Sequence, residues 1–206
     1  DRRAFENWRL RDLATREALV KRVQAPIVVF KALLESHRIP DLLSSHRNSR
    51  AFWVYRHYAA KVRSHVMHWP GGRNQIDNLI RSRLLVDWRA LGMTDQTYDI
   101  VRAHYSPGMN NATALALFWY YRNRLFFEQS LDTNVDVHLL KYEAILLDPE
   151  YEFKRIVEFA GSRMPKLPEG FVTGTTKIPD VEIEDGVRAL CDDMFQRLEA
   201  IYHEQK

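Results

Sequence analysis

The sequence predicts an α/β fold, with a parallel sheet flanked by helices. Three short runs rich in β-branched, aromatic or leucine residues stand at 27–30, 50–55 and 135–142. Segments with helical periodicity separate them. Strand, helix, strand and helix within about forty residues is typical of a right-handed βαβ crossover in a parallel sheet. A chain of 206 residues can bury one sizeable core, so we expect a single domain, 1–206.

The charge, the apolar runs and the cysteine content of the chain exclude several classes of function. A net charge of +3 and a pI near 9.0 suit an anionic small ligand but give no basic stripe for nucleic acid. No apolar run has the length of a membrane helix, and no signal segment opens the chain. The single cysteine, Cys191, is flanked by apolar residues, which indicates a core position and a reducing compartment. We therefore expect a cytoplasmic protein without a membrane or nucleic-acid partner.

The first half of the chain supplies two of the predicted strands. Residues 11–24 have the composition of an exposed helix, and Pro26 separates it from "IVVF" (27–30), which we expect to be a buried strand. Residues 36–46 suit a loop and a short helix, and 50–55 suit the second strand. Helices are expected from 58 to 68 and, with an amphipathic pattern, from 75 to 91.

The second half of the chain supplies the third predicted strand and three further helices. Residues 112–131 are so apolar that we expect a long helix buried on most of its surface, before the third strand at 135–142. Asp148 and Pro149 predict the cap and first residue of the next helix, and Gly161 its end. An aperiodic loop (162–179) and a last helix (182–204) complete the chain.

Arg56 follows the second strand, where parallel sheets bind ligands beside helix N-termini. A guanidinium there can hold a phosphate through two hydrogen bonds, and Ser64, eight positions later, can donate another. The alternative is that Arg56 pairs with a surface carboxylate and that Ser64 is a solvated helix residue.

Three stretches bear on this choice: "VVFKALLESHRIPDLL" (28–43), "FWVYRHYAAKVRSHV" (52–66) and "LLKYEAILLDPEYEFKRIVEFAG" (139–161). Together they resemble the sulfotransferase family that uses 3′-phosphoadenosine 5′-phosphosulfate (PAPS), especially its bacterial members. The resemblance covers roughly residues 27–66 and 115–161, and implies a sulfotransferase relative of the P-loop nucleotide folds.

The resemblance also implies roles for particular residues. Arg56 and Ser64 would hold the 3′-phosphate of the nucleotide, and the ring of Tyr142 would border the adenine. His37 would be the base that takes the acceptor's proton, assisted by Lys31 or Glu35. From the residues alone, His37 can equally cap its loop and Tyr142 can fill the core, and Glu143 is expected to brace the structure. Relatives often carry a proline and an aspartate where this chain has Tyr58 and Ala60.

One element of the family is missing. Its Pro-Lys-x-Gly-Thr-Thr loop cradles the 5′-phosphosulfate, whereas the first glycine of this chain is Gly71. By position the loop would precede Asp1, so we expect an incomplete N-terminus and weak or absent sulfuryl transfer. The family's C-terminal Arg-Lys-Gly loop is not evident either, and Lys177 in "TGTTKIP" (173–179) is the nearest candidate for a phosphate contact.

The sequence thus favours a sulfotransferase that moves a sulfuryl group from PAPS to a hydroxyl or amine acceptor without a metal. The metal-compatible spacing of His65 and His68 has no convincing third ligand. Two other interpretations remain open: a non-catalytic binding or scaffold module of the same fold, and another nucleotide-dependent transferase such as a magnesium-dependent kinase. The sequence does not identify the acceptor or the oligomeric state.

Overall fold

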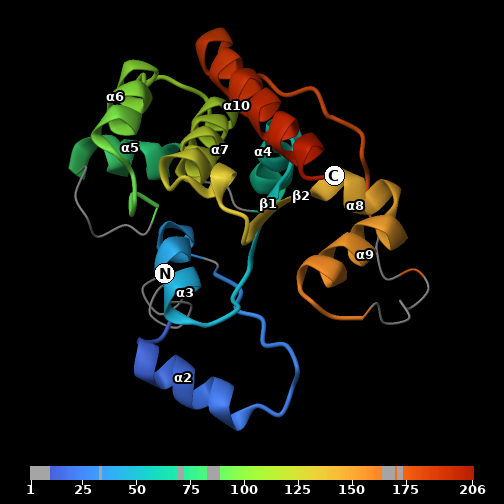
Figure 1. Ribbon diagram of the computed structural model, residues 1–206. Coiled ribbons are helices and arrows are strands. Elements are labelled where there is room, and N and C mark those ends of the chain that lie inside the picture. The colour runs from blue at the N-terminus through green and yellow to red at the C-terminus, as the bar shows by residue number, and fades with distance from the viewer. Residues whose placement is uncertain (1–9, 33, 69–71, 83–88, 164–169, 171–173) are drawn as a thin grey trace.

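The computed structural model describes residues 10–32, 34–68, 72–82, 89–163, 170 and 174–206. Within them the chain is a mixed α/β fold, mostly helical, around a two-stranded parallel sheet (Figure 1). The strands are β1 (Ala51–Tyr55) and β2 (Val137–Lys141). The α-helices are α2 (Leu13–Arg22), α3 (Ile39–Ser45), α4 (Tyr58–His68), α5 (Gly72–Ser82), α6 (Asp95–Ala103), α7 (Asn111–Glu128), α8 (Tyr142–Leu147), α9 (Pro149–Phe159) and α10 (Asp185–Glu204), with short 3₁₀ turns η1 (Ser36–Arg38) and η2 (Leu131–Thr133).

The sheet confirms two of the three predicted strands. β1 and β2 pair in register from Ala51 with Val137 to Tyr55 with Lys141. The outer edge of β2 is closed by Gln205, whose side chain accepts a hydrogen bond from the backbone N–H of Leu139 (2.8 Å) and donates one to the carbonyl of Val137 (3.1 Å). A side chain therefore takes the place of a further strand at that edge.

The prediction of a strand at 27–30 is wrong, and so is the βαβ crossover predicted between that run and β1. The segment has no regular structure, and the side chain of Val29 is 83% exposed. A β-branched run becomes a strand only where another strand satisfies its backbone. No described strand pairs with residues 27–30, since the described sheet consists of β1 and β2.

The sheet lies between two groups of helices. On one face, the indole N–H of Trp53 donates to Asn123 of α7 (3.0 Å) and the hydroxyl of Tyr55 donates to Glu199 of α10 (2.6 Å). On the other face, the ring of Phe159 in α9 stacks on His138 at 3.7 Å. Figure 1 shows the sheet between α7 and α10 on one side and α9 on the other.

The predicted long helix is confirmed as α7, which is buried on most of its surface and packs against α4, α5 and α10. Helix 58–68 is also confirmed, and so is the cap of α9, where Asp148 accepts from the N–H of Tyr151 at 3.1 Å. Gly161, with φ of +72°, follows that helix as expected. Cys191 is buried in the core, and burial raises the pKa of its thiol.

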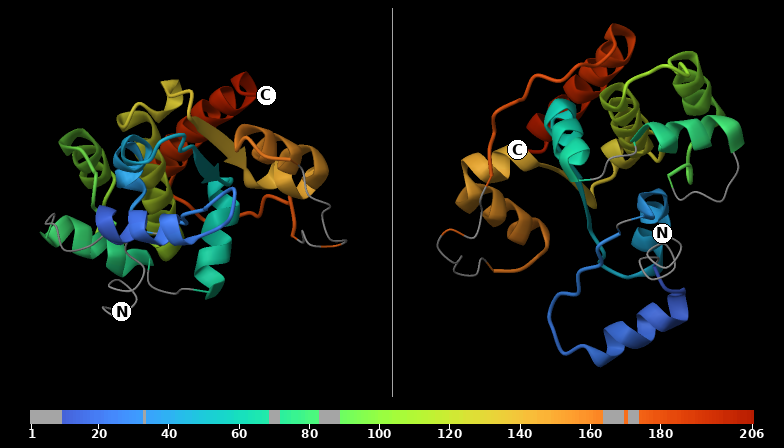
Figure 2. Two further views of the ribbon diagram at one scale, coloured as in Figure 1. Left: turned by 60° about the horizontal axis from the view of Figure 1, so that its bottom comes forward. Right: turned by 180° about the vertical axis from the view of Figure 1, so that it is seen from behind.

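Other boundaries differ from the prediction. The amphipathic helix expected over 75–91 spans 72–82, and its last expected turns fall partly on residues 83–88, outside the described residues. The loop expected over 162–179 also lies partly outside them. Helices α6 and α8 were not predicted. Figure 2 shows α2 at one end of the molecule, away from the sheet. None of the described helices has the length and apolar character needed to cross a membrane.

Candidate functional site

A cluster of polar side chains lies where β1 and β2 end. Tyr55 pairs with Lys141 as the last residues of the two strands, so Arg56 and Tyr142 leave the sheet opposite each other. Their side chains meet, because the guanidinium carbon of Arg56 lies 4.6 Å from the ring centroid of Tyr142. Sequence reasoning placed both residues at this edge but did not predict this contact.

Glu143 completes the cluster from the first turn of α8. Its Oε1 lies 3.7 Å from the Nε of Arg56 and accepts a hydrogen bond from the backbone N–H of His57 at 3.1 Å. The side chain of Glu143 is 9% exposed and that of Arg56 is 24% exposed. Glu143 therefore braces the loop that follows β1, as the sequence predicted, and the carboxylate that pairs with Arg56 is buried rather than on the surface.

The described contacts of Arg56 involve its backbone carbonyl, its Nε and its guanidinium carbon. Its backbone carbonyl accepts from the indole N–H of Trp119 (3.0 Å), which fixes the loop to α7. Its Nε faces Glu143, and its guanidinium carbon lies over the ring of Tyr142. Among the described residues, none accepts a hydrogen bond from either terminal nitrogen of Arg56. These two nitrogens form the fork that binds phosphate or carboxylate bidentately.

The side chain of His57 caps the N-terminal end of α4. Its Nδ1 accepts the N–H of Ala59 at 3.2 Å, and its ring lies against Tyr58 (4.5 Å) and Phe195 (4.7 Å). Burial lowers the pKa of this imidazole below its ordinary value of 6.5. His57 is therefore a neutral ring at pH 7, and a capping role accounts for it.

Lys61 brings a second positive charge to the region, which sequence reasoning did not single out. Desolvation of its ammonium group lowers the pKa of Lys61, and the charge of Arg56 lowers it further. The two cations therefore lie within electrostatic reach of one another.

Ser64 is half-buried on α4. It stands six residues after Tyr58, which is roughly 9 Å along the helix axis at 1.5 Å per residue. Ser64 lies three residues after Lys61, on the same side of α4. No hydrogen bond joins Ser64 and Arg56 within the part of the chain that the structure describes.

The segment that contains Lys177 runs over α8. A Cβ placed on Gly174 would lie 2.9 Å from a methyl group of Leu146 and 3.4 Å from the hydroxyl oxygen of Tyr142. Lys177 follows three residues later, where its backbone N–H donates to the hydroxyl of Thr175 at 3.2 Å and its side chain is exposed. The structure therefore brings the C-terminal basic loop beside Tyr142, but with no described contact between Lys177 and Arg56.

The residues predicted to be catalytic lie elsewhere. η1, which holds His37, is fixed to the last turns of α7, because Arg122 donates to the hydroxyl of Ser36 (2.5 Å) and Gln129 to its carbonyl (3.3 Å). Trp119, which contacts Arg56, precedes Arg122 by three residues and Gln129 by ten, roughly 5 to 15 Å along α7. The structure therefore does not bring His37 into contact with Arg56.

His37 and its predicted helpers have different surroundings. A Cβ placed on Gly92 would lie 2.4 Å from the Cβ of His37, so the two residues are packed closely. Glu35 is buried, accepts from the N–H of Leu10 at 2.7 Å and lies 3.7 Å from Arg38. Lys31 is exposed on the irregular segment before η1. Glu35 therefore serves a structural role at this position.

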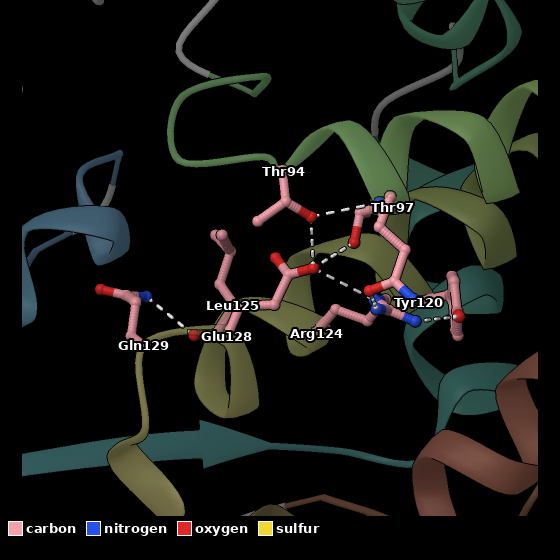
Figure 3. A network of polar contacts seen from close by, with 8 residues as sticks. Thr94, Thr97, Tyr120, Arg124, Leu125, Glu128 and Gln129 are labelled. Atoms are coloured by element: carbon pink, nitrogen blue, oxygen red, sulfur yellow. Dashed lines mark hydrogen bonds and ion pairs between the residues drawn. The ribbon is translucent and has the colours of Figure 1, made fainter.

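A polar network beside η1 also holds the scaffold together (Figure 3). Glu128, in the last turn of α7, accepts from the hydroxyls of Thr94 (2.7 Å) and Thr97 and lies 3.4 Å from the Nε of Arg124. Arg124 also donates to the hydroxyl of Tyr120 at 3.0 Å. The network joins the start of α6 to the end of α7, so we assign it a structural role.

The described residues contain no group of three or more histidine, cysteine, aspartate or glutamate side chains arranged to hold a metal ion. No protein-family model, curated protein or solved structure matches the chain.

Proposed function

We propose that the chain binds PAPS with Arg56 on its 3′-phosphate and transfers the sulfuryl group to a hydroxyl or amine acceptor. The observation that carries the proposal is the fixed guanidinium of Arg56, whose terminal nitrogens have no acceptor among the described residues. It stands at the carboxyl ends of two parallel strands, where α/β proteins bind their ligands. The sequence resemblance to PAPS-dependent sulfotransferases selects the ligand.

Charge supports an anionic ligand. Glu143 offsets the charge of Arg56, so a second cation is needed for a net attraction. Lys61 supplies that charge on α4, whose N-terminal turn favours anions through its dipole. Ser64, on the same side of α4 as Lys61, is in reach of an anion that extends from Arg56 along the helix.

In the proposed reaction, the acceptor oxygen or nitrogen attacks the sulfur atom of PAPS. The bond between sulfur and the bridging oxygen breaks, and adenosine 3′,5′-bisphosphate leaves with both electrons of that bond. The acceptor's proton goes to His37, whose imidazole suits a base near neutral pH. Lys31 would neutralise the charge on the bridging oxygen, whereas the contacts of Glu35 with Leu10 and Arg38 leave it a structural role.

The separation of His37 from Arg56 fits this assignment. The 3′-phosphate and the sulfuryl group are at different ends of PAPS, so a base and a 3′-phosphate ligand should not touch each other. Tyr142 would contact the nucleotide through the part of its ring that Arg56 does not cover, and Lys177 would approach it from the segment over α8. These roles come from the resemblance, and the positions of the residues are compatible with them.

Two measurements test the proposal. The first compares binding of adenosine 3′,5′-bisphosphate with that of adenosine 5′-monophosphate by calorimetry. A 3′-phosphate site predicts tighter binding of the bisphosphate by about ten-fold or more, since a charge-assisted contact to phosphate is worth about 1.5–3 kcal/mol. Equal affinities would overturn the assignment of Arg56.

The second measurement separates the alternatives. Because the sequence contains no Pro-Lys-x-Gly-Thr-Thr loop, the proposal predicts only slow sulfuryl transfer from PAPS to a panel of phenols, alcohols and amines, unaffected by a chelator. Phosphoryl transfer from a nucleoside triphosphate that stops when magnesium is removed would identify a kinase instead. Tight bisphosphate binding without turnover of either donor would identify a binding module.

A further inference from the structure

Glu143 contacts two different groups of the loop after β1 with a single oxygen. Its Oε1 accepts from the backbone N–H of His57 at 3.1 Å and lies 3.7 Å from the Nε of Arg56. Glu143 is buried and is the second residue of α8, directly after Tyr142. The end of β2 therefore holds both the backbone and the side chain that follow β1.

These contacts restrict the guanidinium of Arg56 from two sides. The guanidinium carbon lies over the ring of Tyr142, 4.6 Å from the ring centroid, and Glu143 lies beside its Nε at 3.7 Å. A planar group held against a ring face and at one edge has little freedom to rotate. Its remaining edge, which carries the two terminal nitrogens, then points in a fixed direction.

Electrostatics alone does not explain an acid at this position. A buried carboxylate is costly to desolvate, and its charge repels the anion that Arg56 would bind. Glu143 therefore favours binding through geometry. Phosphate binds through two hydrogen bonds more readily when the guanidinium fork is already oriented before the ligand arrives.

We infer that Glu143 is a positioning residue, which orients Arg56 and the backbone at His57 so that the guanidinium fork meets the 3′-phosphate of a nucleotide. The inference rests on the proposed function for its ligand. It predicts that removing the charge of Glu143 weakens phosphate binding although the site becomes more positive. A purely electrostatic account predicts the opposite sign.

The test uses Glu143→Gln, which keeps the size of the side chain and removes its charge. Calorimetry should show that its affinity for adenosine 3′,5′-bisphosphate falls about ten-fold, the equivalent of one charge-assisted contact. Affinity for adenosine 5′-monophosphate, which lacks the 3′-phosphate, should stay within about two-fold. Bisphosphate binding that is unchanged or tighter in Glu143→Gln would overturn the inference.

Glu199→Gln is the matched control. Glu199 is a half-buried acid at the same sheet, and it accepts from Tyr55 and from Lys141 at 2.6 Å and 2.5 Å on the α10 side. It has no contact with Arg56, so its substitution should leave the ratio of the two affinities unchanged. A similar loss of bisphosphate selectivity in Glu199→Gln would contradict a specific role for Glu143.

A second readout needs no nucleotide. Amide hydrogen exchange at His57 should accelerate in Glu143→Ala, because the acceptor of that N–H is gone, while exchange in the middle of α7 stays unchanged. If the unsubstituted chain binds neither nucleotide, the proposed function fails and exchange at His57 alone decides whether Glu143 holds this loop. Unchanged exchange at His57 would overturn the inference in either case.

Discussion

The guanidinium of Arg56 lies over the ring of Tyr142, with its central carbon 4.6 Å from the ring centroid. The two residues directly follow β1 and β2 and are 86 positions apart, and the parallel pairing of the two strands brings them together. The contact links strand register to the candidate site, because a shift of one strand by a single residue would separate the two side chains.

Tyr142→Leu should weaken nucleotide binding, whereas Tyr142→Phe should retain it. A partly exposed cation–π contact is worth about 0.5–2 kcal/mol, so we expect the dissociation constant of adenosine 3′,5′-bisphosphate to rise roughly two- to thirty-fold in the leucine variant. Phenylalanine keeps the ring face that Arg56 covers. Calorimetry on both variants checks this, and an equal loss in both would assign the effect to the hydroxyl instead.

His37→Gln should lower sulfuryl transfer without changing nucleotide affinity. Removing a general base costs about 10²–10⁴ in rate, and no described contact joins His37 to Arg56. The measurements are the rate of transfer from PAPS and the dissociation constant of adenosine 3′,5′-bisphosphate. His203→Gln, on the exposed side of α10, is the control. A variant that loses nucleotide affinity but keeps its rate would contradict the role of His37.

Gly92→Ala should destabilise the fold. Gly92 has φ of +82°, and a Cβ there would lie 2.4 Å from the Cβ of His37. The left-handed backbone alone costs a non-glycine residue about 1–2 kcal/mol, and the clash adds to it. Urea unfolding measures the loss. Gly108→Ala is the control, since a Cβ at Gly108 has no described atom within 4 Å. Equal stabilities for the two variants would show that the packing at His37 is looser than described.

His138 should make the protein less stable in mild acid. Burial against Phe159, and then the charges of Arg155 and Arg50, lower its pKa from 6.5. Above pH 6.5 the ring is neutral in both states and contributes nothing. As the pH falls below 6.5, the unfolded chain binds a proton that the folded chain does not, so the free energy of unfolding decreases.

The comparison is between the unsubstituted chain and His138→Phe, which keeps a ring against Phe159. Urea unfolding at pH 7.5 and pH 5.5 should show a smaller decrease in the phenylalanine variant, by at most about 1.4 kcal/mol for each pH unit below 6.5. His57 and His65 also have lowered pKa values, so some decrease should remain. An identical decrease in both proteins would show that His138 titrates normally when folded.

Local signals in the sequence were sufficient for several elements. The aromatic run before Arg56 predicted β1, Asp148 and Pro149 predicted the start of α9, and apolar composition predicted the burial of α7. These features depend on residues a few positions apart. The bracing role of Glu143 was predicted as well, although its partners, Arg56 and His57, were not.

Features that depend on distant partners were not predicted. Residues 27–30 have strand composition but no described strand to pair with, and Gln205 closes the outer edge of β2 from the far end of the chain. The approach of Lys61 to Arg56 requires the start of α4 to be known. The docking of η1 on α7 through Arg122 likewise depends on tertiary packing, so the distance between His37 and Arg56 was not accessible from spacing.

The most direct test of the central claim is a calorimetric titration of the chain and of Arg56→Ala with adenosine 3′,5′-bisphosphate, with Arg102→Ala in α6 as the matched arginine control. The account predicts saturable binding to the unsubstituted chain and to the control. It predicts a loss of at least about ten-fold in Arg56→Ala, because a charged, bidentate contact disappears. Equal binding by all three proteins, or binding by none, would contradict a 3′-phosphate site at Arg56.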